Sequence, residues 1–575
     1  MTTNPQCPGT DLRFDWMHFR LVSVKEGNTV EKEIPLKKLR YVGLGLIAGS
    51  LLLACSSEPV DRSPIAKKEA LASFGSQAKM VESRMSVDMA MAARLRQGAG
   101  QIAESRDRFE TVEENRVYRV AEEPVSTFSS DVDTASYSFS RRRLSSGRLP
   151  EPNAIRLEEW LNYFDYDYPV PTDPTTPFRP QVTVTDSPWK EGNKLVHIGI
   201  QGYELPETTR PRANLVFLLD VSGSMSADDK LPLLKQSLTM MLDDMPEDDT
   251  VAIVVYAGAS GVVLPPTSVK EKTKILMALN QLQAGGSTAG GEGIKVAYQL
   301  AEANFDEDAV NRVLLATDGD FNVGVTDRKT LEGLVARKRE KGIYLSVLGF
   351  GEGNYNDHLM QTLAQNGNGV AAYIDNLNEA RKVLVTEATS SLFPIAEDLK
   401  IQVEFNPATV LEYRLLGYET RALEREDFNN DAVDAGDIGA GHSVTAIYEI
   451  TPVGGTPLIT PSRYETRPTQ EQGKGKSGEY AFLILRYKLP GENVSKHMEK
   501  PIPAHNTPVD ETLRTQETAF ATAVAGAAQL LQGGKYTGDW SLDDAIDLAQ
   551  ANRGDDLYGY RAEFVQLLRL AGASD

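Results

Sequence analysis

Residues 214–225 read NLVFLLDVSGSM, an unbroken apolar run that ends in a carboxylate and two serines. A short run of this kind is typical of a strand that is covered on both faces, as in a parallel sheet. A helical pattern follows in KLPLLKQSLTMMLDDM at 230–245, and a second apolar run follows in VAIVVYA at 251–257. Because strand and helix patterns go on alternating, the sequence predicts an α/β fold with a doubly wound, mostly parallel sheet over residues 211–392.

The segments on either side of this sheet have different patterns. Residues 123–210 mix aromatic residues with one helical and two strand patterns, so we expect an N-terminal α+β domain there. Residues 393–575 begin with strands that alternate apolar and polar residues and end in helical sequence such as FATAVAGAAQLLQG. They predict a C-terminal domain that is β-rich first and α-helical afterwards.

The composition of the chain excludes several classes of function and of metal site. A chain of 575 residues suggests three to four domains at about 150 residues each. The net charge of -21 argues against nucleic acid as a partner, because phosphate binding needs a basic face. The two cysteines, Cys7 and Cys55, exclude a disulfide scaffold and a multi-cysteine metal site. The six histidines are scattered, so a local histidine-paired zinc motif is absent.

A short apolar segment lies near the N-terminus. Three basic residues precede YVGLGLIAGSLLLA at 41–54, and Cys55 follows directly. This stretch is too short for a bilayer, which takes roughly 20 apolar residues, and it predicts a secretory signal region over residues 1–54. Its ending, LLAC, resembles the lipobox of bacterial lipoproteins. The resemblance implies cleavage before Cys55 and a lipid on its thiol; the alternative is a buried apolar helix that ends in an ordinary cysteine.

The lipobox resemblance sets an expected location. It implies a lipid-anchored protein of the bacterial cell envelope, and in a Gram-negative cell Ser56 after the cysteine favours the outer membrane, facing the periplasm. Residues 55–122 are rich in Ala, Ser, Glu, Arg and Met, so we expect a partly helical tether between membrane and folded domains. Residues 1–36 are too acidic for a signal, so we expect translation to begin near Val30 to Leu36 at a non-Met start codon.

Three segments of the predicted sheet carry oxygen-bearing side chains. Ligands of open parallel sheets bind beyond the carboxyl ends of the strands, where Asp220 and Asp318 are both expected. Two carboxylates and three hydroxyls make an all-oxygen set that suits a hard cation such as Mg²⁺. The alternative for the first segment alone is a helix N-cap at Asp220. The candidate ligands are Asp220, Ser222, Ser224, Thr288 and Asp318.

These segments carry a family resemblance. FLLDVSGSM at 217–225, GGSTAGGEGI at 285–294 and LLATDGDFNVG at 314–324 resemble the metal-ion-dependent adhesion site of von Willebrand factor type A domains. The resemblance implies a Rossmann-like domain in which the serines and Thr288 contact a divalent ion and the aspartates act partly through water. Mg²⁺ is the expected ion, with Mn²⁺ or Ca²⁺ as alternatives. More weakly, the whole chain resembles uncharacterised bacterial lipoproteins with this domain in the middle, an associated domain upstream and a domain of unknown function downstream.

These features favour a binding protein over an enzyme. We expect an envelope lipoprotein whose metal ion captures an acidic residue of a protein partner, anchored to a membrane through its lipid. A metal-assisted hydrolase is the alternative, but the motif segments offer only Asp320 and Glu292 as general bases. An adaptor for an AAA-type ATPase is a further alternative, which requires that the chain is not exported.

Two other motifs are given ordinary interpretations. GKGKS at 473–477 has Gln470 where a phosphate-binding loop needs its first glycine, so we expect a solvated loop. Asp131 and Asp133 are expected to serve in turns or caps rather than in a metal site.

Overall fold

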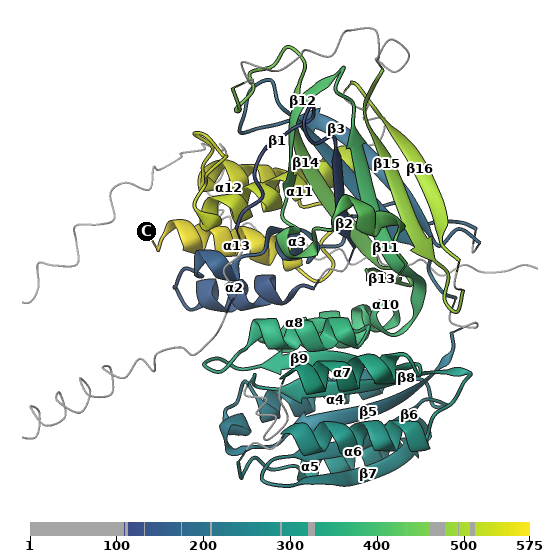
Figure 1. Cartoon of the computed structure of the whole chain (residues 1–575). Helices are drawn as coiled ribbons and strands as arrows, with labels where there is room; N and C mark the ends of the chain where they lie inside the picture. The colour runs from purple at the N-terminus through teal and green to yellow at the C-terminus, as the bar shows by residue number, and fades with distance from the viewer. Residues whose placement is uncertain are drawn as a thin grey trace, which may run out of the picture. The chain divides into compact units, whose positions relative to one another are not determined.

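The computed structural model describes a defined part of the chain (Figure 1). The signal region, Cys55, most of the tether and the GKGKS segment lie outside it. The described residues are 109 and 113–574, except 131–132, 174, 207–209, 288–289, 320–327, 432, 434, 461–477, 493 and 506–511.

The central sheet has six strands in the order β10-β9-β8-β5-β6-β7. Five of them run parallel, and the edge strand β7 runs antiparallel to β6. The strands are β5 (Arg212–Asp220), β6 (Thr250–Tyr256), β7 (Ser260–Ser268), β8 (Ala309–Thr317), β9 (Ile343–Phe350) and β10 (Ala371–Ile374). The predicted α/β class with a mostly parallel sheet is confirmed.

Helices cover both faces of this sheet, and alternate residues of β5 face opposite cores. Leu215, Phe217 and Leu219 pack in one apolar core, whereas Val216 and Leu218 pack in the other. This two-sided burial explains the unbroken apolar run. One core contains α4 (Leu231–Asp244), α5 (Lys272–Gln281), α9 (Leu377–Arg381) and α10 (Ala388–Leu392). The other contains α6 (Gly290–Ala303), α7 (Arg328–Arg339) and α8 (Asp357–Asn366).

Strands from before and after the central sheet pair with one another in two further sheets. One has the order β1-β12-β14-β4-β3, and the other has β13-β11-β15-β16 with β2 beside β11. A single apolar core contains residues of both sheets. The strands are β1 (Tyr118–Arg119), β2 (Val125–Ser129), β3 (Phe178–Asp186), β4 (Lys194–Gly202), β11 (Pro394–Phe405), β12 (Val410–Leu416), β13 (Gly436–Gly439), β14 (Ser443–Pro452), β15 (Glu479–Lys488) and β16 (Lys496–Pro503). The flanking segments therefore form one strand-rich sandwich, with the central sheet inserted between β4 and β11.

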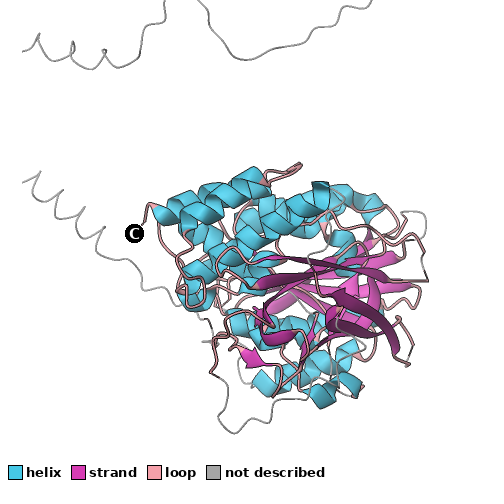
Figure 2. Cartoon of the chain, turned by 90° about the horizontal axis from the view of Figure 1, so that it is seen from above, coloured by secondary structure: helices cyan, strands magenta, loops and turns pink. Residues whose placement is uncertain are grey.

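A helical layer packs on the sandwich. In Figure 2 the helices run alongside the magenta strands. The helices are α2 (Ala135–Ser145), α3 (Leu157–Leu161), α11 (Thr512–Gln532), α12 (Leu542–Ala551) and α13 (Tyr560–Gly572). Their apolar side chains share a core with Leu195 of β4 and Ile447 of β14, so helices from both ends of the described chain cover the same sheet. None of the helices described is long and apolar enough to cross a membrane.

One turn holds both connections between the sandwich and the central sheet. The amide of Gly441 donates to the carbonyl of Tyr203, just after β4, at 2.9 Å. The amide of Ala440 donates to the carbonyl of Phe393, just before β11, also at 2.9 Å. A side chain at Gly439 would overlap the backbone of Ser390, so this approach requires glycine. The chain therefore enters and leaves the central sheet at the same place.

Asp133 has a different role from the turn or cap that the sequence predicts. Its side chain is buried, accepts a hydrogen bond from the amide of Ala371 at 2.9 Å and pairs with Arg421 at 3.1 Å. Ala371 begins β10, and Arg421 ends the short helix η6 (Glu419–Arg421) of the sandwich. The described chain thus has two bodies, which are the central sheet with the helices that cover it and the sandwich with its helical layer. Asp133 links these two bodies. Asp131 lies outside the described residues.

A buried cluster around Arg141 makes a second link. Arg141 lies on α2, and its guanidinium donates to Asp375 at the end of β10, to Glu379 at 2.8 Å and to the Tyr163 hydroxyl at 2.6 Å. It also lies 3.5 Å from Glu563 on α13. Burial raises the pKa of Asp375, and the positive charge of Arg141 opposes that shift. The charge of one arginine therefore holds together carboxylates from the central sheet and the helical layer.

We expect Arg141→Met to lower the free energy of unfolding by about 3–5 kcal/mol, because the buried carboxylates lose their counter-charge. Urea unfolding followed by circular dichroism measures this change. The control is Arg148→Met, which removes a surface pair with Glu352 and should change stability by less than about 1 kcal/mol. Equal effects of the two substitutions would contradict a central role for Arg141.

Candidate functional site

Two carboxylates meet at the carboxyl ends of neighbouring strands. Asp220 is the last residue of β5, and Asp318 directly follows β8. The two strands pair in parallel, and both side chains are fully buried. The Thr317 hydroxyl donates to Asp220 Oδ2 at 3.5 Å, which ties the two strand ends together.

The loop after β5 turns two serine hydroxyls towards each other. The amide of Ser222 donates to Asp220 Oδ1 at 2.8 Å, and the hydroxyl oxygens of Ser222 and Ser224 lie 3.0 Å apart. Helix α4 starts only at Leu231, and the side chain of Ser222 caps nothing at the short helix η3 (Gly223–Ser226). Because Asp220 lies three residues before the first residue of η3, whose N-cap is Ser222, the interpretation of Asp220 as an N-cap does not hold.

The second motif segment lies against this loop. The amide of Gly223 donates to the carbonyl of Gly286 at 3.0 Å, and the amide of Gly285 donates to the carbonyl of Val221 at 2.8 Å. Helix α6 then begins close to β6, where a side chain at Gly293 would come within 2.8 Å of Tyr256 Cβ. Thr288 lies outside the described residues. The backbone before and after Thr288 thus lies beside the carboxyl ends of β5 and β6.

The electrostatics of the site follow from its burial. Burial raises the pKa of Asp220 to about 6, while the hydrogen bonds from Ser222 lower it and the charge of Asp318 raises it further. Ser224 is exposed, so the cluster opens to solvent on that side. A cation at this position would compensate a carboxylate pair that the protein has removed from water.

A lysine that the sequence analysis did not select completes the described site. Lys230, just before α4, is only 7% exposed, and its ammonium donates to Asp318 Oδ2 at 2.8 Å. Its stem packs on Gly351, where an added Cβ would lie 2.3 Å from the Lys230 Cε. In the sequence, Lys230 looks like any charged residue at the start of an amphipathic helix.

The arrangement fits a divalent ion. Neighbouring oxygens of an octahedral Mg²⁺ at about 2.1 Å lie about 3.0 Å apart. The hydroxyls of Ser222 and Ser224 have this separation, with Asp220 directly beside them. No group of three or more His, Cys, Asp or Glu side chains that could hold a metal occurs among the described residues. The candidate site has two carboxylates and combines them with hydroxyls.

Two acidic residues are the candidate general bases for hydrolysis. Glu292 is exposed on the first turn of α6, and Asp320 lies outside the described residues.

Comparison with known proteins assigns the chain to a family. Residues 214–385 match the von Willebrand factor type A domain, residues 103–197 match a von Willebrand factor family and residues 390–573 match the C-terminal family of the uncharacterized protein YfbK. YfbK of Escherichia coli K12 is 43% identical over 477 residues, which cover 81% of this chain and 82% of that protein. The chain belongs to the YfbK family of von Willebrand factor type A domain proteins. The family resemblance inferred from the motifs is therefore confirmed.

Two further similarities extend over parts of the chain. The uncharacterized protein sll0103 of Synechocystis is 32% identical over 167 residues, covering 29% of this chain and 39% of that protein. A solved von Willebrand factor type A protein from Catenulispora acidiphila covers 71% of this chain and 91% of its own, with 16% identity and a TM-score of 0.39.

We expect Gly319→Ala to destabilise the protein, because Gly319 adopts φ +95° and a Cβ would lie 2.4 Å from the carbonyl oxygen of Asn354. Backbone strain alone costs about 1–2 kcal/mol, and the overlap adds to it. The matched control is Gly353→Ala, where φ is +100° but no atom lies within 4 Å of the added Cβ. Urea unfolding should show a clearly larger loss for Gly319→Ala; similar losses would mean that Gly319 does not lie against the backbone of Asn354 as described.

Proposed function

We propose that the chain binds a protein partner through a divalent ion held by Asp220, Ser222, Ser224, Thr288 and Asp318. The observation that carries the proposal is the convergence of Asp220, Asp318 and the two serine hydroxyls, 3.0 Å apart, at adjacent strand ends. Membership of a family with a von Willebrand factor type A domain supports it.

The ligand set favours capture of a carboxylate. Neutral hydroxyls leave most of the charge of a bound ion uncompensated, so the ion offers a Lewis-acidic position to an oxygen from outside. The exposed Ser224 marks the side from which a partner can approach. In this proposal the partner is a protein that presents an Asp or Glu side chain, and the ion is Mg²⁺, with Mn²⁺ or Ca²⁺ as alternatives.

The place of action belongs to the same proposal. Basic residues, the apolar segment 41–54 and Cys55 support a lipoprotein signal, with the mature chain anchored in the cell envelope. In a Gram-negative cell the folded part would face the periplasm from the outer membrane. The acidic balance of the chain, at -21 overall, gives no electrostatic attraction to anionic lipid, so the anchor has to supply the membrane affinity.

We expect Asp220→Ala to weaken Mg²⁺ binding by at least about 100-fold in calorimetry of the full chain. The same substitution should abolish Mg²⁺-dependent crosslinking to partner proteins in intact cells, with mass spectrometry as the readout. Asp228→Ala is the control, because Asp228 is an exposed carboxylate close to the loop but outside the ligand set. Crosslinks that survive in EDTA, or an Asp220→Ala protein that binds Mg²⁺ normally, would refute the proposal.

We expect Lys230→Met to strengthen Mg²⁺ binding by about tenfold or more, because the ammonium next to Asp318 repels a second cation. The matched control is Lys235→Met, since the Lys235 ammonium donates to the carbonyls of Asn280 and Leu282, away from the site. Calorimetry measures both variants. Weaker binding by Lys230→Met would show instead that the lysine serves to orient Asp318.

A further inference from the structure

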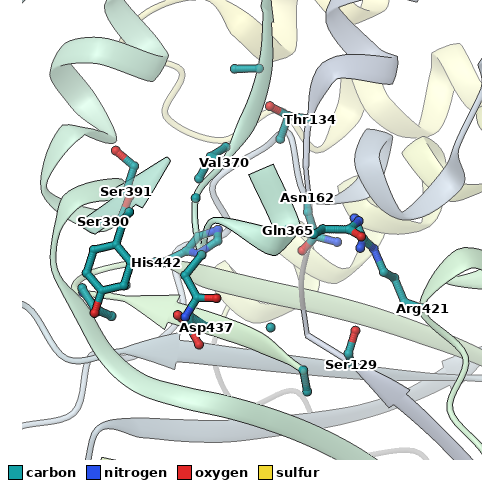
Figure 3. Close-up of a pocket in the computed structure, with 18 of the residues that line it drawn as sticks. Ser129, Thr134, Asn162, Gln365, Val370, Ser390, Ser391, Arg421, Asp437 and His442 are labelled. Carbon is teal, nitrogen blue, oxygen red and sulfur yellow. The ribbon is translucent and has the colours of Figure 1, made fainter. Parts of the chain in front are cut away.

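A cavity lies at the amino ends of the central strands, opposite the ends that carry Asp220 and Asp318. It has a volume of about 360 Å³ and is bounded by the central sheet on one side and the sandwich on the other (Figure 3). Arg312 near the start of β8 and Tyr344 near the start of β9 line it, whereas Asp220 and Asp318 lie at the strands' other ends. The volume is in the range of about 300–1,000 Å³ that is typical of small-molecule sites.

The wall of the cavity is mostly polar. In Figure 3, Asp437 and His442 lie on one side, and Gln365 and Arg421 lie on the other. Hydroxyls and amides from both bodies add further donors and acceptors. Burial lowers the pKa of His442 to about 4, so this imidazole is neutral at pH 7. The wall therefore offers many hydrogen-bonding groups besides its two arginines and two carboxylates.

Arg312 is the unusual group in this wall. It is 3% exposed, its Nη1 donates to the Ser346 hydroxyl at 2.8 Å, and its guanidinium lies over the ring of Tyr344 at 5.4 Å. Its Nε has no hydrogen-bond partner, and Arg312 forms no ion pair with a carboxylate of the described residues. Burial lowers its pKa to about 10. Buried guanidinium groups are normally paired, because desolvation of the charge is costly.

The other arginine of the cavity provides the contrast. Arg421 is also nearly buried, but it forms an ion pair with Asp133 at 3.1 Å. The protein therefore neutralises the charge of Arg421, whereas the charge of Arg312 is available to a ligand that enters the cavity.

The acidic residues of the wall limit which kind of ligand can bind in the cavity. Glu387 pairs with Lys382, and Asp437 accepts a hydrogen bond from the amide of Asp398 at 3.3 Å. The charge of Asp437 reaches Arg312 without forming an ion pair with it. Two carboxylates in the wall disfavour a dianion such as phosphate, whereas one carboxylate matches the planar guanidinium. An amine on the same molecule would match Asp437.

We propose that this cavity binds a free amino acid or a similarly small zwitterion, with its carboxylate on Arg312 and its amine towards Asp437. The proposal is independent of the metal site, because none of the four candidate metal ligands that the structure describes lines the cavity.

The test measures thermal unfolding of the full chain with an equimolar mixture of the common amino acids, with acetate and with inorganic phosphate as separate probes. The mixture should raise the unfolding midpoint in proportion to the logarithm of its concentration. Its individual components are then titrated by calorimetry, and Arg312→Gln should lose at least tenfold in affinity for the component that binds. Phosphate should give no rise. A rise with phosphate alone, or the same rise in Arg312→Gln, would overturn the proposal, as would the absence of any rise.

A second measurement tests the proposal without any ligand. Without any probe, Arg312→Met should unfold at the same or a higher urea midpoint than the unmodified chain, because it removes an uncompensated buried charge. A marked fall in that midpoint would mean that Arg312 is a structural arginine, and this result too would overturn the proposal.

Discussion

The hydrogen bonds of one turn, Gly439–His442, decide how the two bodies are joined. Gly441 and Ala440 hold the chain just after β4 and just before β11, and His442 accepts from the amide of Gly202 at 2.8 Å. Because both connections are fixed at the same place, the central sheet is attached at one point of the backbone. The side-chain links through Asp133 and Arg141 then restrict how it can pivot about that point.

Strand β8 connects two sites of opposite character. Its first residues carry Arg312 into the cavity, and the residue after its end is Asp318. Six residues of extended strand separate the two by about 20 Å. One end of the sheet thus gathers carboxylates and hydroxyls, and the other end holds a guanidinium that forms no ion pair with the residues described. A parallel sheet makes this possible because equivalent strand ends lie together along each edge.

The sequence predicted the central sheet well and the sandwich poorly, for physical reasons. Unbroken apolar runs such as NLVFLL identify two-sided burial directly, and the motif residues follow the strands that carry them. Alternating strands show which face is buried but not which strand is the neighbour, so the pairing of β4 with β14 was not foreseen. The separate N-terminal and C-terminal domains expected on either side share their sheets. Lys230 and Arg312 escaped notice because charged residues at the start of a helix or strand usually face solvent.

The insertion of the central sheet has a consequence for the order of events during synthesis. Gln201 pairs with Ser443, and Thr127 pairs with Gln402, so β2 and β4 leave the ribosome long before these partner strands exist. The central sheet, in contrast, is complete within one continuous stretch of chain and can form first. Its folding brings the end of β4 close to the start of β11, which shortens the loop that the late strands must close. If the central sheet forms first, the module that carries the proposed metal site also sets the distance across which the strands on either side of it must pair.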